Sequence, residues 1–360
     1  MNAACNNSPH LCDLSYGAIT HLGTHNSPFI RDKSTSFSTS GNQYFNVTVQ
    51  LDAGIRLLQG QLHRDSNGGE PRLCHSTCTL MDGGTLRDWL SHIKAWMDQH
   101  ASEVVTLLIA NGDRVTASEL LPSFTNSGTD LLAFVPSPAG TRIPKFPTLQ
   151  TMIKDDKRLV VFVTAGGGDA SVPFLLNEWD YIWETKWENT DPKAWSCAVD
   201  RPGRLRGEGG IKRAQSEGVV PLLNWYLYVN MGLGMMRPYV EVITDTNGPS
   251  LTTGLETCKD SSHWAALLPP RVPTFVLVDF FNDGSPIATI DALNNVTDPV
   301  NRVTPPPTPT QTEGENWGSK GKSGGERVLD ELLFKIDNEG LSPKWGDWIL
   351  ASGDWANLWI

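Results

Sequence analysis

Short apolar runs rich in β-branched residues recur along the chain, and helical or turn-forming segments separate them. Such runs between turn signals predict β-strands. Strands are expected at about residues 18–25, 54–63, 72–76, 104–111, 158–164, 181–185, 221–227 and 274–280. Because strands that alternate with helical connections form a parallel sheet covered by helices, eight of them predict an α/β fold of the (β/α)8 TIM-type barrel class.

One connection shows a clear helical period. Between Thr85 and Ser102, apolar residues recur at the spacing of a single helix face, namely Leu86, Trp89, Leu90, Ile93, Trp96 and Met97. Residues 104–110 follow as a continuous apolar run, which suits a strand covered on both faces. Weaker helical patterns lie at 148–156 and 286–294.

The composition changes after the last predicted strand. We expect a barrel domain over residues 1–300 and a Pro- and Gly-rich linker over 301–326, which contains Pro305-Pro306-Pro307. Residues 327–360 are expected to form a short amphipathic helix and a Trp-rich tail. Such a tail can pack back on the barrel, lie on a membrane surface or bind a partner, and packing back is the simplest interpretation.

The composition is that of a folded, acidic protein. A hydrophobic content of 39% with 13 Trp and 12 Phe supports a substantial core. The net charge of −11 argues against a nucleic-acid partner, which demands a basic face, and disfavours purely electrostatic docking on an anionic membrane. No apolar run reaches the roughly 18 to 20 residues of a membrane span.

Six cysteines lie at positions that suit disulfides. The first two flank a Pro-containing turn, the next two are four residues apart, and the last two fall in predicted loops. A metal site is the weaker interpretation, because the spacings give no paired C-x2-C beside histidines. We infer an oxidising, extracellular compartment and three disulfides, namely Cys5–Cys12, Cys74–Cys78 and Cys197–Cys258.

N-glycosylation sequons at Asn6, Asn46 and Asn295 fit a secreted glycoprotein, although such tripeptides are common by chance. No signal peptide is visible, and we expect that Met1 stands in place of one that was removed.

Two histidines lie at the ends of predicted strands, where a barrel of this kind places its active site. They are His25 and His75. Imidazole moves protons near neutral pH, so a facing pair suits general base and general acid chemistry. A single histidine of this kind is more often a buried group with satisfied hydrogen bonds, but the two together favour catalysis.

Three polar side chains alternate along the second predicted strand and therefore share a face: Gln59, Gln61 and His63. His63 is a candidate third proton carrier. Asp113 ends another strand, where it could bond a substrate hydroxyl or stabilise a turn.

Four further candidates lie near the ends of later strands. Asp279 could orient a histidine or bind a sugar hydroxyl. Trp183, Trp225 and Tyr226 offer flat apolar surfaces to a ring, although core packing is the commoner use of such side chains.

The chain resembles a known family around these residues. It is similar to the X-region of the phosphatidylinositol-specific phospholipase C superfamily, above all to secreted fungal PLC-like phosphodiesterases, over roughly residues 5–300. The motifs that carry the resemblance are Gly23 to Ser27, Leu51 to Arg56, Leu57 to Gln61, Cys74-His75, Val104 to Asp113, Trp183 to Thr185, Val199 to Pro202 and Phe275 to Phe281.

The resemblance implies a role for each histidine. In bacterial members one histidine deprotonates the inositol 2-hydroxyl and a second protonates the leaving alkoxide, so that a cyclic phosphate forms without metal. By motif position His25 matches the base and His75 the acid. The chemistry itself requires one group to remove a proton and another to supply one.

The departures from the bacterial pattern concern charge. This chain has Gln59 where an Asp assists the base, and Gln61 where an Arg contacts the phosphate. Losing a charge-assisted bond in the transition state could cost about 2–4 kcal/mol. Arg56 is a substrate-binding candidate with a structural role as the alternative, and Arg31 and Lys186 are candidates to replace the missing charge.

Calcium-dependent members carry carboxylates at the positions of Gln59 and Gln61 and another acid at the position of Ala110. Of that ligand set only Asn26 survives, and it is kept as a substrate-binding candidate. Calcium prefers several charged oxygen ligands, so we expect no catalytic metal, and no cofactor.

These observations predict a secreted, metal-independent phosphodiesterase that uses paired histidines, and the family resemblance implies an inositol-phospholipid-like substrate. The expected partners are a phosphodiester or lipid head group and, transiently, a membrane surface. We expect a monomer. The alternatives are a catalytically silent protein that binds the head group, and a barrel redirected to a different small-molecule reaction, such as one of secondary metabolism.

Overall fold

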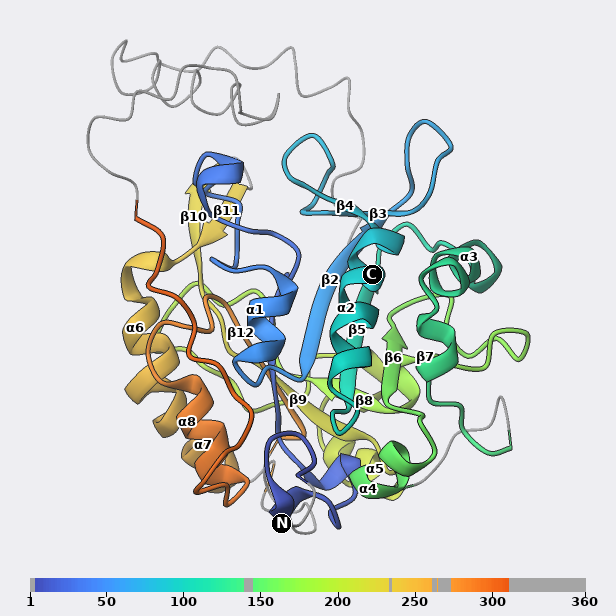
Figure 1. Ribbon diagram of the computed structural model, residues 1–360. Coiled ribbons are helices and arrows are strands. Elements are labelled where there is room, and N and C mark those ends of the chain that lie inside the picture. The colour runs from blue at the N-terminus through green and yellow to red at the C-terminus, as the bar shows by residue number, and fades with distance from the viewer. Residues whose placement is uncertain (1–3, 139–144, 233–234, 261–263, 265–272, 311–360) are drawn as a thin grey trace.

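The computed structural model describes residues 4–138, 145–232, 235–260, 264 and 273–310, and its centre is a curled parallel sheet (Figure 1). The expected barrel-like α/β fold is therefore confirmed. Every neighbouring pair along its main path is parallel. The path runs through β7 (Leu175–Asn177), β6 (Leu159–Val163), β5 (Val105–Asn111), β2 (Leu57–His63), β1 (His21–Thr24), β12 (Phe275–Val278), β9 (Val220–Asn224) and β8 (Ile182–Glu184).

One predicted barrel strand is wrong. Residues 72–76 contain β3 (Arg72–Cys74), which pairs antiparallel with the end of β2 and with β4 (Asp82–Thr85). This small hairpin extends the sheet beyond the barrel path. The remaining parallel strand is β7, which the sequence pattern did not reveal because three residues are too few to show a period.

Helices cover the outer face of the sheet (Figure 1). Thr85 caps the long α2 helix by accepting a hydrogen bond from the Asp88 backbone N–H, and the buried face of α2 is the predicted one. The other helices near 148–156 and 286–294 are also present. The α-helices are α1 (Val47–Asp52), α2 (Leu86–Gln99), α3 (Ala117–Ser127), α4 (Leu149–Lys154), α5 (Gly210–Ser216), α6 (Ile243–Asp245), α7 (Leu251–Asp260) and α8 (Pro286–Leu293).

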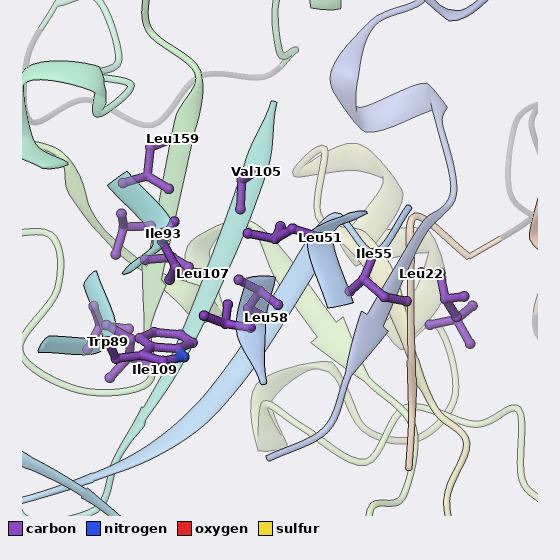
Figure 2. Packing of buried hydrophobic residues seen from close by; sticks show 14 of the residues in the cluster. Leu22, Leu51, Ile55, Leu58, Trp89, Ile93, Val105, Leu107, Ile109 and Leu159 are labelled. Carbon is purple, nitrogen blue, oxygen red and sulfur yellow. The ribbon is translucent and has the colours of Figure 1, made fainter. Parts of the chain in front are cut away.

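Alternation along the strands divides the core into two layers. Leu58, Leu107 and Ile109 point outward and pack against Trp89 and Ile93 of α2 (Figure 2). The intervening residues, such as Leu57, Leu108, Phe162 and Phe275, form a second cluster inside the barrel.

The covalent cross-links are those expected. Disulfides join Cys5 to Cys12, Cys74 to Cys78 and Cys197 to Cys258. The second of them encloses His75 in a sequence separation of four residues.

The first residues of the predicted linker lie against the barrel. The Val303 backbone N–H donates to the Asp52 carbonyl, and Arg302 forms an ion pair with Asp291. Thr308 accepts a hydrogen bond from Asn282. Residues 311–360, and with them the predicted Trp-rich tail, lie outside the described residues. Within the described ranges, no helix has the length and apolar character to cross a bilayer.

The two ends of the barrel differ. The β3–β4 hairpin and the hairpin of β10 (Tyr228–Gly232) and β11 (Met235–Pro238) lie at one end, and the N-terminal segment lies at the other (Figure 1). The first end carries the carboxyl ends of β1, β2, β9 and β12, so the predicted strand-end residues lie on one rim.

Arg56 is a correction to the sequence analysis. It precedes β2 at the amino end of the barrel, is 4% exposed, and donates twice to Glu103 Oε2, at 2.9 and 2.7 Å. Further donated bonds reach the Leu51 and Ile55 carbonyls and Asn7 Oδ1. Its expected substrate-binding role is therefore wrong, because all of its polar atoms are used to lock the end opposite the candidate site.

Replacing Arg56 by Met tests this structural role. The change leaves the Glu103 carboxylate buried without its partner, so we expect the free energy of unfolding to fall by about 3–5 kcal/mol, measured by urea denaturation. As a control, Arg72→Met removes a surface ion pair with Asp82 and should cost less than about 1 kcal/mol. Equal losses in the two variants would contradict the assignment.

Candidate active site

A hydrogen-bonded pair lies where β1 and β12 end. His25 directly follows β1, Asp279 directly follows β12, and the register pairs Thr24 with Val278 just before them. His25 Nδ1 lies 2.8 Å from an Asp279 oxygen, which also accepts a 3.1 Å bond from Asn42. With Nδ1–H donating to the carboxylate, the lone pair of His25 lies on Nε2.

The environment of Asp279 affects its charge. Burial raises the pKa of this carboxyl, and the hydrogen bonds from His25 and Asn42 oppose that shift. The second Asp279 oxygen is buried and has no hydrogen-bond partner within the described residues. The carboxylate therefore depends on His25 and Asn42 for its stabilisation.

Two tyrosines hold the other side of the His25 ring. The Tyr226 ring stacks on it at 3.8 Å between centroids with an interplanar angle of 6°. The Tyr228 hydroxyl lies 3.4 Å from Nε2. Burial raises the pKa of both hydroxyls well above the usual value, so both keep their protons and Tyr228 can donate to Nε2.

The expected ring-binding roles of Trp183 and Trp225 are wrong. Both side chains belong to the cluster between the sheet and the helices, while Tyr226 belongs to the cluster inside the barrel. Trp225 stacks on Trp195 at 3.8 Å, and Trp183 packs edge-on against Trp264. They are core residues because their positions along the strands place them on the outward face.

His75 follows β3 at the same rim and is 6% exposed. Its Nδ1 has no hydrogen-bond partner in the described part of the chain. The pKa of His75 is lowered to about 3, chiefly because burial removes water from the charged form, and further because His25 and His63 are close enough to repel it. The two predicted catalytic histidines are thus electrostatic neighbours.

Gln59 and Gln61 brace the segments that carry the histidines. Gln59 Oε1 accepts a 2.6 Å bond from the backbone N–H of Asn26, the residue after His25. Gln61 Oε1 accepts a 3.0 Å bond from the backbone N–H of Ser76, the residue after His75. Asn26 has a positive φ of 51°, and its Nδ2 donates to Asn42 Oδ1. Its Oδ1 is buried and has no hydrogen-bond partner within the described residues.

His63 and Asp113 form an adjacent pair. Their side chains approach to 3.3 Å, and Asp113 also accepts a bond from the Arg64 backbone N–H. Both line a groove of about 420 Å³ that continues past Ser76 and Cys78. They remain candidates for contact with a substrate beside His75.

Within the described residues, no hydrogen bond or ion pair joins Arg31 or Lys186, the cations expected to replace the missing charge, to either histidine. Lys186 is exposed just beyond β8, and no contact in the described residues joins its side chain to His25 or His75. Arg31 lies near Tyr44 and Glu241, and burial lowers its pKa.

Sequence reasoning gave no role to Asn42, Tyr228, Glu184 or Arg201. Glu184 and Arg201 lie in motifs that carry the family resemblance, and those motifs were the sequence signal that could have identified them. Tyr228 continues the alternation begun by Tyr226, although β9 ends at Asn224.

Comparison with known proteins places this geometry in context. The family model described as PI-PLC X matches residues 11–294. A PI-PLC X domain-containing protein 1 of Arthroderma benhamiae is 34% identical over 297 residues, which cover 81% of this chain and 90% of that protein. An uncharacterized secreted protein of the same fungus is 32% identical over 302 residues, and the match spans 81% of this chain but only 64% of that protein.

A solved structure with a similar fold is a variant of phosphatidylinositol-specific phospholipase C from Staphylococcus aureus. The TM-score is 0.52, and the match covers 78% of this chain and 94% of that one. At 12% sequence identity, this likeness concerns the fold alone.

The state of His75 can be tested by following its ring resonances in a pH titration, with His75→Gln used for assignment. We expect the ring to stay neutral down to about pH 3. An unfolded histidine binds a proton below about pH 6.5, so this group should destabilise the fold as the pH falls from 6.5 toward 3, by up to about 1.4 kcal/mol per pH unit. Titration near pH 6.5 would contradict the burial argument.

Proposed function

The chain belongs to the PI-PLC X family, and on that basis we propose that it is a metal-independent phosphodiesterase that uses His25 and His75 as general base and general acid. The observation that supports this most is the 2.8 Å bond between His25 and Asp279, which leaves Nε2 as the proton-accepting atom beside a second buried histidine. The substrate is a phosphodiester with a neighbouring hydroxyl.

The base step follows from the geometry of His25. Nε2 takes the proton of the substrate hydroxyl as the hydroxyl oxygen forms a bond to phosphorus. Asp279 holds the ring in place through Nδ1 and stabilises the positive imidazolium that results. Since the nucleophile belongs to the substrate itself, proximity supplies much of the rate.

The acid step depends on the charge of His75. As the bond from phosphorus to the leaving alkoxide breaks, His75 gives that oxygen a proton and a cyclic phosphate remains. With a pKa of about 3, His75 is a neutral imidazole in the empty site at neutral pH and lacks the second proton that an acid would donate. A nearby phosphate anion favours the charged form of an imidazole, so substrate binding would load the acid.

Metal independence is proposed from the chemistry of the side chains present. Where calcium would require charged oxygen ligands, the chain has Gln59, Gln61 and Asn26. Both glutamine oxygens already accept backbone N–H bonds, at 2.6 and 3.0 Å. These residues fit a structural role around the histidines better than a role as calcium ligands.

The substrate and setting are proposed from the relatives. An inositol phospholipid or a glycosylated form of one fits a member of this family, and it would be met at a membrane surface. Three disulfides and a relative described as secreted support an extracellular protein. We propose that the chain acts as a monomer with a barrel domain ending near residue 300 and a tail beyond the linker.

A second candidate function is head-group binding without turnover. The low pKa of His75 favours it, because an acid that stays neutral cannot protonate a leaving group. Under this alternative the protein would bind the head group and release no product.

The deciding experiment is phosphorus NMR of the protein with phosphatidylinositol in detergent micelles containing EDTA. We expect a cyclic inositol phosphate from the wild type. His25→Ala and His75→Ala should each lose about 100-fold or more of the rate, and Asp279→Asn should lose up to about 10,000-fold because it disturbs the tautomer of His25. Binding of the lipid with no product would refute the proposal and favour the silent protein.

A further inference from the structure

Arg201 lies on the same rim as the histidines, at the end of β8. Its backbone pairs with that of Glu184, the last residue of β8: the Glu184 N–H donates to the Arg201 carbonyl at 2.8 Å, and the Arg201 N–H donates back at 3.2 Å. The guanidinium is therefore carried at the carboxyl end of the barrel, where His25 follows β1.

The Arg201 guanidinium is fixed in place by its neighbours, but not all of its N–H donors have partners within the described residues. It lies over the rings of Trp179 and Trp187, at 5.6 and 5.5 Å from their centroids, and Nη2 donates to Glu184. The side chain is 35% exposed, and Nε is buried with no hydrogen-bond partner in the part of the chain that the structure describes. Of the five N–H donors of a guanidinium, one Nη2–H is given to Glu184 and the Nε–H is buried, so the two of Nη1 are among the donors left for a ligand.

A continuous set of contacts joins Arg201 to His25. Glu184 Oε2, which holds Arg201, also accepts a 3.3 Å bond from Asn224. The Asn224 side-chain oxygen accepts a 3.2 Å bond from the Tyr226 hydroxyl, and the Tyr226 ring stacks on His25. Arg201 is thus connected, through Glu184, Asn224 and Tyr226, to the side chain that packs on His25.

Two acidic side chains, Glu178 and Glu184, lie beside Arg201, and they differ in their tendency to be charged. Glu178 is fully buried, and its pKa is raised well above the usual value by that burial and by the nearby Glu184 charge. This shift favours the neutral form of Glu178, so the carboxylate that pairs with Arg201 is that of Glu184. Arg201 is also near enough to the Tyr228 hydroxyl, which contacts His25 Nε2, to oppose the rise in its pKa.

We propose that Arg201 binds an anionic oxygen of the substrate phosphate and supplies the positive charge that Gln61 does not. This rests on the phosphodiester chemistry proposed above. The planar guanidinium suits phosphate because it offers parallel donors, which a lysine lacks. Phosphate bound there would also place negative charge near the two histidines, as the loading of His75 requires.

Binding measurements test this without requiring turnover. Isothermal titration of the full chain with myo-inositol 1-phosphate and with myo-inositol separates the phosphate contribution from the ring contribution. We expect the phosphate compound to bind the wild type at least about tenfold more tightly, because hydrogen bonds between a guanidinium and a phosphate are charge-assisted. Arg201→Gln should abolish that ratio and leave myo-inositol binding unchanged.

Two further variants make the test specific. Arg206→Gln removes an exposed cation of the same segment, which pairs with Asp200, and should keep the ratio within about twofold. Arg201→Lys keeps the charge beside Glu184 and removes the fork, so its ratio should be intermediate. If Arg201→Gln fails to fold, Arg201→Lys becomes the test of the proposal. A ratio of affinities equal to that of the wild type in Arg201→Lys would then count against it.

The inference is overturned if the ratio survives in Arg201→Gln, if wild type binds both compounds equally, or if the variant loses myo-inositol binding to the same extent. Phosphate-dependent binding that requires Arg201 but gives no product would leave the inference standing and refute the proposed catalysis. Turnover that does not depend on Arg201 would support the proposed catalysis and refute the inference about Arg201.

Discussion

The hydrogen bond between Asp279 and His25 is the interaction around which the candidate site is organised. It exists because β1 and β12 are parallel neighbours in a register that pairs Thr24 with Val278, so that the next residue of each strand emerges at the same rim. A shift of one residue would turn one of the two side chains to the opposite face of the sheet. The bond is therefore a property of the whole barrel, whose core fixes that register.

The same burial that makes this bond strong makes the second histidine difficult to charge. His75 lies in a turn closed by the Cys74–Cys78 disulfide, next to the Phe29 ring, and its pKa falls to about 3. A site with two buried imidazoles and neutral Gln59 and Gln61 needs an anion to become an acid catalyst. In the proposed mechanism the substrate phosphate is that anion, and Arg201 is the cation that we propose binds it.

Much of this arrangement could be predicted from the sequence, for specific reasons. Asp279 follows the apolar run of residues 275–278 and His25 follows another predicted strand, and parallel strands bring their carboxyl ends together. The short spacing of Cys74 and Cys78 made their pairing predictable. Trp183 and Trp225 were misplaced because a strand buried on both faces shows no alternation from which the inward side can be read. Arg56 was misplaced because its partner Glu103 is distant in sequence, and β7 was too short to show a pattern.

If His25 acts as the base and His75 as the acid, their alanine variants should respond differently to a change of leaving group. The rates of wild type, His25→Ala and His75→Ala would be compared on an inositol phosphodiester with an alkyl alcohol as leaving group and on one with nitrophenol, which departs without protonation. We expect His75→Ala to lose about 100-fold or more on the alkyl substrate and less than about tenfold on the nitrophenyl one, while His25→Ala loses about 100-fold or more on both. Equal losses of His75→Ala on the two substrates would contradict its role as the acid.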